Sequence, residues 1–251
     1  NMKPTKNGIG LGYQELIKNK KIIKLDFRSQ LDQIRSEIKD SDIFIHNFKT
    51  NRIFKMGLSF DDVLKLNPAI IYVSISGYPE NGVMTGKGAH DLNILAMSGY
   101  LGQQIKLGEI SALPNLLLAD TFTSYSVALK ILSAILLEKR GVHLQISMFE
   151  AMKQSMLVAQ YFDPVGFPMS GKLPCYGIYK SKDGFVTVAA LESALWTDFC
   201  HHLGREDLIP KQFETKFVTE IAGEMLKYGN KHWLDKSLDF CVTPIVSVHD
   251  I

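Results

Sequence analysis

The sequence predicts an α/β protein with a largely parallel sheet, followed by a smaller α+β domain. Between residues 20 and 147, short apolar or β-branched runs alternate with segments of helical periodicity, which is typical of strand–helix–strand units. Residues 163–174 carry three prolines and two glycines, as a hinge between modules would. Beyond them a hairpin pattern precedes several helices. We therefore expect a large domain over residues 1–168 and a small domain over 169–251.

The expected strands and helices of the large domain follow from these runs. Strands are expected at 22–27, 42–48, 69–74 and 142–148. Helices are expected over the segment with Leu31, Ile34 and Ile38, near 61–66, at 91–100, at about 121–139, and at about 149–161. The helix at 121–139 is apolar on nearly every face, which predicts a central, buried element.

The small domain should begin with two paired strands. Residues 176–180 and 185–191, joined around Asp183-Gly184, are typical of a β-hairpin. Helices are expected to follow at about 193–203, 213–228 and 231–240. The sequence contains neither an internal repeat nor a low-complexity tract.

Composition allows a substantial core and suggests a phosphate-bearing ligand. The chain has 251 residues, of which 46% are hydrophobic and 22% are charged. The net charge of +2 hides an asymmetry, because residues 1–55 hold 12 Lys and Arg against 6 Asp and Glu. Phosphate is thus a candidate ligand near this part of the chain. Without an RNA-binding signature or zinc-finger spacing, we expect no nucleic acid partner.

Cysteine usage and hydropathy indicate the compartment. Cys175, Cys200 and Cys241 are widely spaced and form no C-x-x-C pair, which argues against a disulfide framework or a zinc site. The first residues lack an apolar leader, and the longest apolar stretch, 126–137, is too short to span a membrane and contains Lys130. We expect a soluble, cytoplasmic protein without membrane or metal.

A glycine-rich segment at 77–88 superficially resembles a phosphate-binding loop. A Walker A loop needs four residues between its glycines and a Ser or Thr after the Lys. Here Gly82 and Gly86 are separated by three residues, and Gly88 follows Lys87. A mobile surface loop or a cover for an active site remain the two interpretations.

Ionisable residues stand at the ends of several predicted elements. Asp120 lies where an apolar run becomes the long helix, so it is either a helix N-cap or a reactive carboxylate near free N–H groups. His90 and Asp91 open an earlier helix, and Glu192 ends the predicted strand 185–191. Element ends are where α/β proteins gather their sites.

Two chemistries suit these groups. A His and a carboxylate on opposite sides of a carbon acid form a two-base racemase, in which one removes a proton and the other supplies one. The helix N-terminus at Asp120 could stabilise the enolate oxygen. Alternatively, Asp120 could attack an acyl-thioester and form a mixed anhydride, as in a transferase.

Seven stretches, in order over nearly the whole chain, resemble the class III CoA-transferase family. They are residues 19–26, 41–48, 56–58, 67–78, 89–93, 118–120 and 241–244. Within this family, the pair His90-Asp91 resembles the alpha-methylacyl-CoA racemase branch. The resemblance implies a Rossmann-like large domain, a small domain, and a homodimer of two interlocked chains. It also implies an acyl-CoA thioester as substrate, with no cofactor beyond the CoA that the substrate carries.

The resemblance also implies roles for individual residues. His90 and Asp120 would be the two bases, with Asp91 and Glu192 supporting their protonation states.

For the CoA, Asn47 and Phe48 match a stretch that lies along it, and Lys55 occupies the place of a basic residue that meets a phosphate.

The chain also departs from the family pattern. Residues 49–51 are Lys-Thr-Asn instead of Arg-Pro-Gly, and Pro79 replaces a glycine. The family's first strand and helix have no counterpart before Tyr13, and a returning segment is absent after Ile251, so a truncated member is expected. Three functions follow as alternatives: racemisation of 2-methylacyl-CoA, CoA transfer through Asp120, or a non-catalytic remnant.

Overall fold

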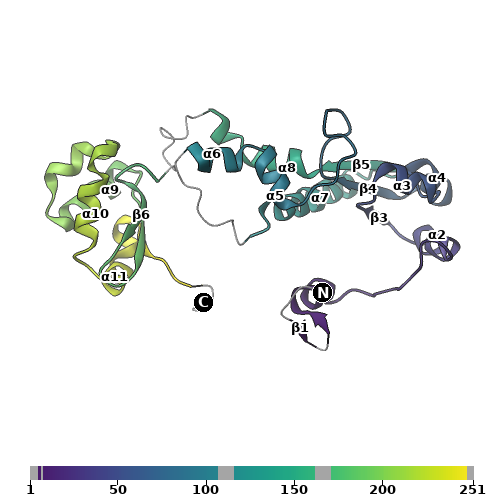
Figure 1. Cartoon of the computed structure of the whole chain (residues 1–251), viewed down its shortest axis with the longest axis horizontal. Helices are drawn as coiled ribbons and strands as arrows, with labels where there is room; N and C mark the ends of the chain where they lie inside the picture. Colours follow the sequence, from purple (N-terminus) through teal and green to yellow (C-terminus); the bar gives the residue numbers. More distant parts are fainter. Residues whose placement is uncertain (1–4, 7, 107–115, 162–170, 248–251) are drawn as a thin grey trace. The chain divides into compact units, whose positions relative to one another are not determined.

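The computed structural model describes residues 5–6, 8–106, 116–161 and 171–247, which form two compact units (Figure 1). Unit 1 comprises Asn1–Ile94 and Leu117–Met152, and unit 2 comprises Leu95–Leu116 and Lys153–Ile251. The predicted domain boundary between residues 168 and 169 lies outside the described residues, as does most of the predicted hinge. Each unit is therefore considered by itself.

Unit 1 is built on a parallel sheet of three strands in the order β3-β4-β5. These strands are β3 (Ile43–His46), β4 (Ile71–Ser76) and β5 (Val142–Ser147). His46 is opposite Ser74, which is opposite Gln145. The predicted α/β fold with parallel strands is confirmed, although β3 and β5 are shorter than expected and β4 begins and ends two residues later than expected.

Helices cover one face of this sheet and pack around a first cluster of buried apolar residues. These helices are α2 (Leu31–Lys39), α3 (Thr50–Lys55) and α4 (Phe60–Leu66). α2 buries Ile34 and Ile38, which are spaced by one helical turn, against this face. α4 begins with a capping box, because the Ser59 hydroxyl accepts from the Asp62 N–H at 3.3 Å and the Asp62 carboxylate accepts from the Ser59 N–H.

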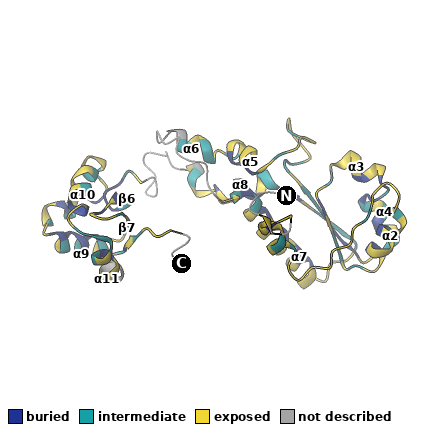
Figure 2. Ribbon diagram, turned by 60° about the horizontal axis from the view of Figure 1, so that its bottom comes forward, coloured by how far each residue is buried: buried dark blue, intermediate teal, exposed yellow. Residues whose placement is uncertain are grey.

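The other face of the sheet packs against the long helix α7 (Leu118–Leu136). Val127, Ile131 and Ala134 contact the apolar side of β4 and β5. The opposite side of α7 exposes large apolar residues, with Leu129 67% and Leu136 82% accessible (Figure 2). The prediction of a helix buried on all faces is therefore wrong, because only the sheet side of α7 is covered in the described chain.

The predicted strand at 22–27 is absent from the structure, where this segment is irregular and ends in a turn. Ile22 and Ile23 are 49% and 40% exposed, and no described strand pairs with them. An apolar β-branched run becomes a strand only where a neighbour supplies its hydrogen bonds. Before it lie β1 (Thr5–Lys6), β2 (Ile9–Gly10) and α1 (Leu11–Ile17), which buries no residue.

Two predicted helices are each interrupted. The helix expected at 91–100 is α5 (Asp91–Met97), followed by α6 (Tyr100–Lys106) after Gly99, which has a φ of +92°. A positive φ ends a helix because the left-handed region breaks the hydrogen-bond pattern. The helix expected at 149–161 is α8 (Met148–Ser155) followed by the 3₁₀ turn η1 (Val158–Tyr161).

Unit 2 contains an antiparallel sheet in the order β6-β7-β8. The strands are β6 (Tyr176–Lys180), β7 (Phe185–Ala189) and β8 (Val242–Pro244). The helices are α9 (Ser193–Leu203), α10 (Val218–Met225) and α11 (Asn230–Phe240), with the 3₁₀ turns η3 (Glu206–Lys211) and η4 (Thr215–Phe217). The predicted hairpin is confirmed, whereas the helix expected at 213–228 is regular α-helix only in α10.

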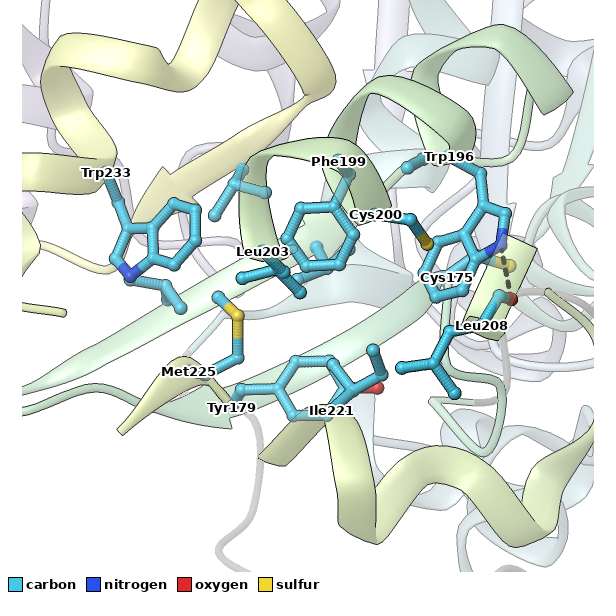
Figure 3. Packing of buried hydrophobic residues seen from close by; sticks show 14 of the residues in the cluster. Cys175, Tyr179, Trp196, Phe199, Cys200, Leu203, Leu208, Ile221, Met225 and Trp233 are labelled. Atoms are coloured by element: carbon cyan, nitrogen blue, oxygen red, sulfur yellow. Dashed lines mark hydrogen bonds between the residues drawn. The ribbon is translucent and has the colours of Figure 1, made fainter. Parts of the chain in front are cut away.

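The core of unit 2 is aromatic. Trp196, Phe199 and Trp233 are at most 1% exposed and pack with Tyr179 from β6 (Figure 3). The indole N–H of Trp196 donates to the Leu208 carbonyl oxygen at 3.2 Å, so its polar atom is satisfied inside the core. This packing gives unit 2 a hydrophobic core of its own.

Gly77 brings two segments of unit 1 together at the carboxyl end of β4. A Cβ atom on Gly77 would lie 2.7 Å from the Cβ atom of Ala89. The glycine thus lets residues 89–91 return to the end of the strand after the excursion of residues 78–88. The Gly77 carbonyl also accepts from the Phe149 N–H at 3.0 Å, which ties this point to the start of α8.

We predict that Gly77→Ala destabilises the protein by about 1–3 kcal/mol, because the added methyl forces the neighbouring backbone apart. Urea unfolding followed by circular dichroism measures the effect. Gly88→Ala is the matched control, since a Cβ there meets nothing within 4 Å. Equal stability of the two variants would contradict the close approach.

Candidate functional site

The N-terminal ends of two helices meet through a carboxylate. Asp91 is the first residue of α5 and is only 9% exposed, and Asp120 lies in the first turn of α7 and is half-buried. The backbone N–H of Asp120 donates to Oδ1 of Asp91 at 3.1 Å. Asp91 therefore satisfies one of the N–H groups that α7 cannot bond within itself.

Asp120 is not the N-cap that local sequence suggested. Leu117 occupies that position and has no capping side chain, so Asp120 is the third residue of the helix. The acceptor that a local N-cap would have supplied comes instead from Asp91, 29 residues earlier. The Asp120 carboxylate is consequently left free of a capping role.

The surroundings raise the proton affinity of Asp120. Burial raises the pKa of the Asp120 carboxyl, and the negative charge of Asp91 raises it further, while His90 acts in the opposite direction. Three of the four residues that sequence analysis grouped, His90, Asp91 and Asp120, thus interact in the structure. The direction of this shift favours the protonated form of Asp120 more than in a free aspartate.

His90 immediately precedes α5, and its backbone is held by Asn93. The His90 N–H donates to Oδ1 of Asn93 at 3.0 Å, and the His90 carbonyl accepts from the Asn93 N–H at 2.9 Å. The imidazole is exposed and makes no hydrogen bond with the described residues. The backbone of His90 is held in place while its imidazole stays accessible, so the ring can contact a substrate.

Topology places these groups at the carboxyl edge of the sheet. α7 leads directly into β5, so it runs antiparallel to the strands and its N-terminal turn lies at their carboxyl ends. Asn47 and Phe48 directly follow β3 at this edge, where Asn47 is exposed and Phe48 is half-buried. Lys55 ends α3 and is exposed. Ligands of open α/β sheets bind at this edge.

Glu192 belongs to unit 2. It is exposed and directly precedes α9 in extended conformation, while β7 ends earlier than predicted, at Ala189. The described geometry of the site concerns unit 1, so the role predicted for Glu192 stays a prediction.

A cavity of about 640 Å³ opens at the carboxyl ends of the strands, on the face covered by α3 and α4. Its lining includes Phe48, as well as His46, Tyr72, Ser74 and His143, which sequence analysis did not single out. Ser74 Oγ lies 2.8 Å from Nε2 of His143. The signal that could have found them is period-two alternation, because each of these strand residues faces away from α7.

Among the described residues that line the cavity, none carries a positive charge near neutral pH. Burial lowers the pKa of His46 to about 4, with a smaller contribution from His143, and burial also lowers the pKa of His143. Asp61, Glu80 and Glu150 are among the lining residues, and no Lys or Arg is. Phosphate groups are therefore not expected inside it.

The described residues include neither a metal-ligand cluster nor a helix that could span a membrane. No group of three or more His, Cys, Asp or Glu in them could hold a metal ion. None of their helices is long and apolar enough to cross a membrane.

Comparison with known proteins gives consistent relatives. The chain is 29% identical to a CaiB/baiF CoA-transferase family protein of Caenorhabditis elegans, across 95% of this chain and 75% of that protein. It is 26% identical to the alpha-methylacyl-CoA racemase of Mus musculus, across 95% of this chain and 68% of that protein. A succinate–glutarate CoA-transferase of Agrobacterium fabrum is 27% identical over 68% of this chain and 45% of its own length.

Solved structures share the fold. A hypothetical protein from Mycobacterium tuberculosis matches with a TM-score of 0.75 and 19% identity, over 92% of this chain and 68% of that one. A CAIB/BAIF family protein from Brucella suis matches with a TM-score of 0.71 and 20% identity, over 92% of this chain and 68% of that one. The family model described as CoA-transferase family III matches residues 1–249. The chain belongs to CoA-transferase family III.

Proposed function

We propose that the protein inverts the α-carbon of 2-methylacyl-CoA thioesters by two-base proton transfer. The observation that carries this proposal is the grouping of His90 and Asp120 at one edge of the sheet, with Asp91 bonded to the Asp120 backbone. Two relatives named alpha-methylacyl-CoA racemase support it.

In the proposed reaction, one of the two residues removes the α-proton and the other delivers a proton to the opposite face of the enolate. The N–H groups of Leu118 and Ala119, which lack partners within α7, are donors for the enolate oxygen. The raised pKa of Asp120 brings its basicity closer to that of an imidazole, so protons can pass in both directions. The reaction needs no cofactor beyond the CoA carried by the substrate.

The proposed CoA site uses the residues after β3. Asn47 and Phe48 would lie along the CoA, and Lys55 would meet a phosphate. Support comes from charge, because Arg52 and Lys55 of α3 are basic, whereas the neighbouring cavity is lined by carboxylates without a cation. We therefore place the phosphates beside α3 and outside the cavity.

CoA transfer is the second candidate. In it, Asp120 attacks the thioester carbonyl and forms a mixed anhydride with release of the CoA thiolate, which then attacks the Asp120 carbonyl and expels the donor acid as a free carboxylate. The acceptor carboxylate attacks the resulting aspartyl-CoA thioester and releases the thiolate again. The thiolate finally attacks the acceptor carbonyl of the second anhydride, which frees the new acyl-CoA and regenerates Asp120. Relatives named as CoA-transferases favour this alternative.

The third candidate is a catalytically inactive remnant of the family that has lost CoA binding. Isothermal titration with 2-methylbutanoyl-CoA tests it, since absence of binding at millimolar ligand would favour the remnant.

We also propose that two copies of the chain associate through α7. Tyr125, Leu129, Leu132 and Leu136 follow one another at helical spacing and are each more than half exposed. A contiguous row of large apolar side chains is unusual on a surface in contact with water. A second copy would cover this row and remove it from water.

His90→Ala is predicted to abolish exchange of the α-hydrogen of 2-methylbutanoyl-CoA into heavy water, because one of the two bases is lost. Nuclear magnetic resonance of the α-position measures the exchange. CoA transfer by Asp120 would barely depend on this residue, so a CoA-transfer assay on the same variant separates the two chemistries. Exchange at the parental rate would refute the racemase proposal.

Asp91→Asn is predicted to move the acidic limb of the pH profile of kcat/KM to lower pH. The negative charge of Asp91 raises the pKa of Asp120, so its removal lowers that pKa and leaves Asp120 ionised in more acidic solution. The asparagine oxygen can still accept from the Asp120 N–H. Asp61→Asn, an exposed carboxylate of the same unit, is the control and should leave the limb in place. An unchanged limb in Asp91→Asn would contradict the coupling.

Leu129→Glu is predicted to shift the protein from dimer to monomer, because a charge would be buried in the interface. Light scattering coupled to size-exclusion chromatography gives the mass. Val83→Glu is the control, since Val83 is 90% exposed on a loop of the same unit. If the Leu129→Glu variant has the same mass in solution as the parent protein, α7 does not form the interface.

A further inference from the structure

A chain of hydrogen bonds lies beneath the residues that follow β3. The Phe48 N–H donates to Nδ1 of His46 at 3.2 Å, and Nε2 of His46 lies 2.8 Å from the Tyr72 hydroxyl oxygen. The Tyr72 hydroxyl donates to the Leu58 carbonyl oxygen at 2.9 Å. His46, Tyr72 and Leu58 are all buried. The chain thus links the loop after β3 to β4 and to the turn before α4.

Only one arrangement of protons satisfies this chain. Nδ1 of His46 accepts a hydrogen bond, so it carries no proton, and the proton of the neutral ring is on Nε2. The single hydroxyl proton of Tyr72 is directed to Leu58, so the Tyr72 oxygen accepts from His46. Burial lowers the pKa of His46 to about 4, which keeps the ring neutral at physiological pH. Neither side chain has a proton left to offer to a ligand.

Phe48 is held on more than its backbone. Its ring packs edge-on against Phe27 at a centroid distance of 5.2 Å, and the Arg52 guanidinium lies over it at 5.2 Å. These contacts fix the ring, while the bond to His46 fixes the peptide that joins Asn47 to Phe48. Asn47 and Phe48 are therefore held in this conformation without a bound ligand.

We propose that His46 and Tyr72 are positioning residues, which hold Asn47 and Phe48 in the conformation that binds acyl-CoA. The inference rests on the proposed function, in which these two residues lie along the CoA. The residues proposed to transfer protons are His90, which precedes α5, and Asp120 of α7, and this chain of hydrogen bonds includes neither. Its loss should therefore weaken CoA binding and leave the proton-transfer step unchanged.

The structure supplies a matched control on the same face of the sheet. Ser74 and His143 form a hydrogen bond of the same length, 2.8 Å, between β4 and β5, and it does not involve the loop after β3. Both pairs line the same cavity. A general disturbance of the cavity would affect both pairs, whereas the positioning role concerns only Tyr72 and His46.

The first experiment compares Tyr72→Phe with Ser74→Ala in the full chain, using 2-methylbutanoyl-CoA. Loss of a hydrogen bond of typical strength predicts that KM rises about fivefold in Tyr72→Phe, with kcat within about twofold of the parent. Ser74→Ala should leave both constants within about twofold. Equal effects of the two substitutions, or a fall in kcat alone, would overturn the proposal.

A second pair of variants tests His46 and guards against misfolding of Tyr72→Phe. His46→Asn keeps an oxygen near the position of Nδ1, which can still accept from the Phe48 N–H, whereas His46→Leu keeps no acceptor. We expect His46→Asn to retain more of the parental KM than His46→Leu. An equal rise of KM in both would contradict a role that acts through the Phe48 N–H.

Hydrogen exchange of the Phe48 amide separates this inference from the proposed function. In His46→Leu the amide should exchange at least about fivefold faster than in the parent, whether or not CoA binds. Unchanged exchange overturns the positioning role even if the protein is a racemase. Faster exchange in a protein whose parental form binds no acyl-CoA would instead refute the proposed function, and with it the role in CoA binding.

Discussion

The candidate site is organised around a hydrogen bond that joins two helix N-termini. By accepting the Asp120 N–H, the Asp91 carboxylate joins the first turn of α5 to the first turn of α7. The same contact puts two negative charges close together, and the carboxyl of Asp120 responds with a raised pKa. The partial positive charge of the two helix ends compensates part of this repulsion. One carboxylate, that of Asp91, therefore both accepts from the first turn of α7 and raises the pKa of Asp120.

The topology of the sheet allows the contact between Asp91 and Asp120 to form. β4 ends beside Gly77, where the absence of a side chain lets Ala89 approach, so the chain re-enters the carboxyl edge just before His90. α7 must return antiparallel to reach β5, which brings its first turn to the same edge. Residues far apart in sequence thus meet through two general properties of parallel sheets: their connections cross over, and their carboxyl ends share one edge.

Local sequence patterns predicted much of this fold, but they failed where the structure of a segment depends on its neighbours in space. The runs around β3, β4 and β5 became strands because each had a neighbour, whereas Ile22 and Ile23 pair with no strand of the described residues and are irregular. His90, Asp91 and Asp120 could be grouped from their places at element ends. The contact of His46 with Tyr72 could not, because it depends on the register of two strands and on a tautomer selected by the Phe48 backbone.

Charge divides the carboxyl edge into regions that suit different parts of a thioester ligand. The described lining of the cavity contains neutral imidazoles and several carboxylates, so an anion would lose its hydration there without gaining a cationic partner. Arg52 and Lys55 lie on α3, and Arg52 is held against the Phe48 ring. A ligand with anionic phosphates at one end and an uncharged thioester at the other can satisfy this division in only one orientation. In the proposed function, a ligand with its phosphates beside α3 would extend its uncharged end along the edge toward the helix N-termini at Asp91 and Asp120, where backbone N–H groups would stabilise a developing oxyanion.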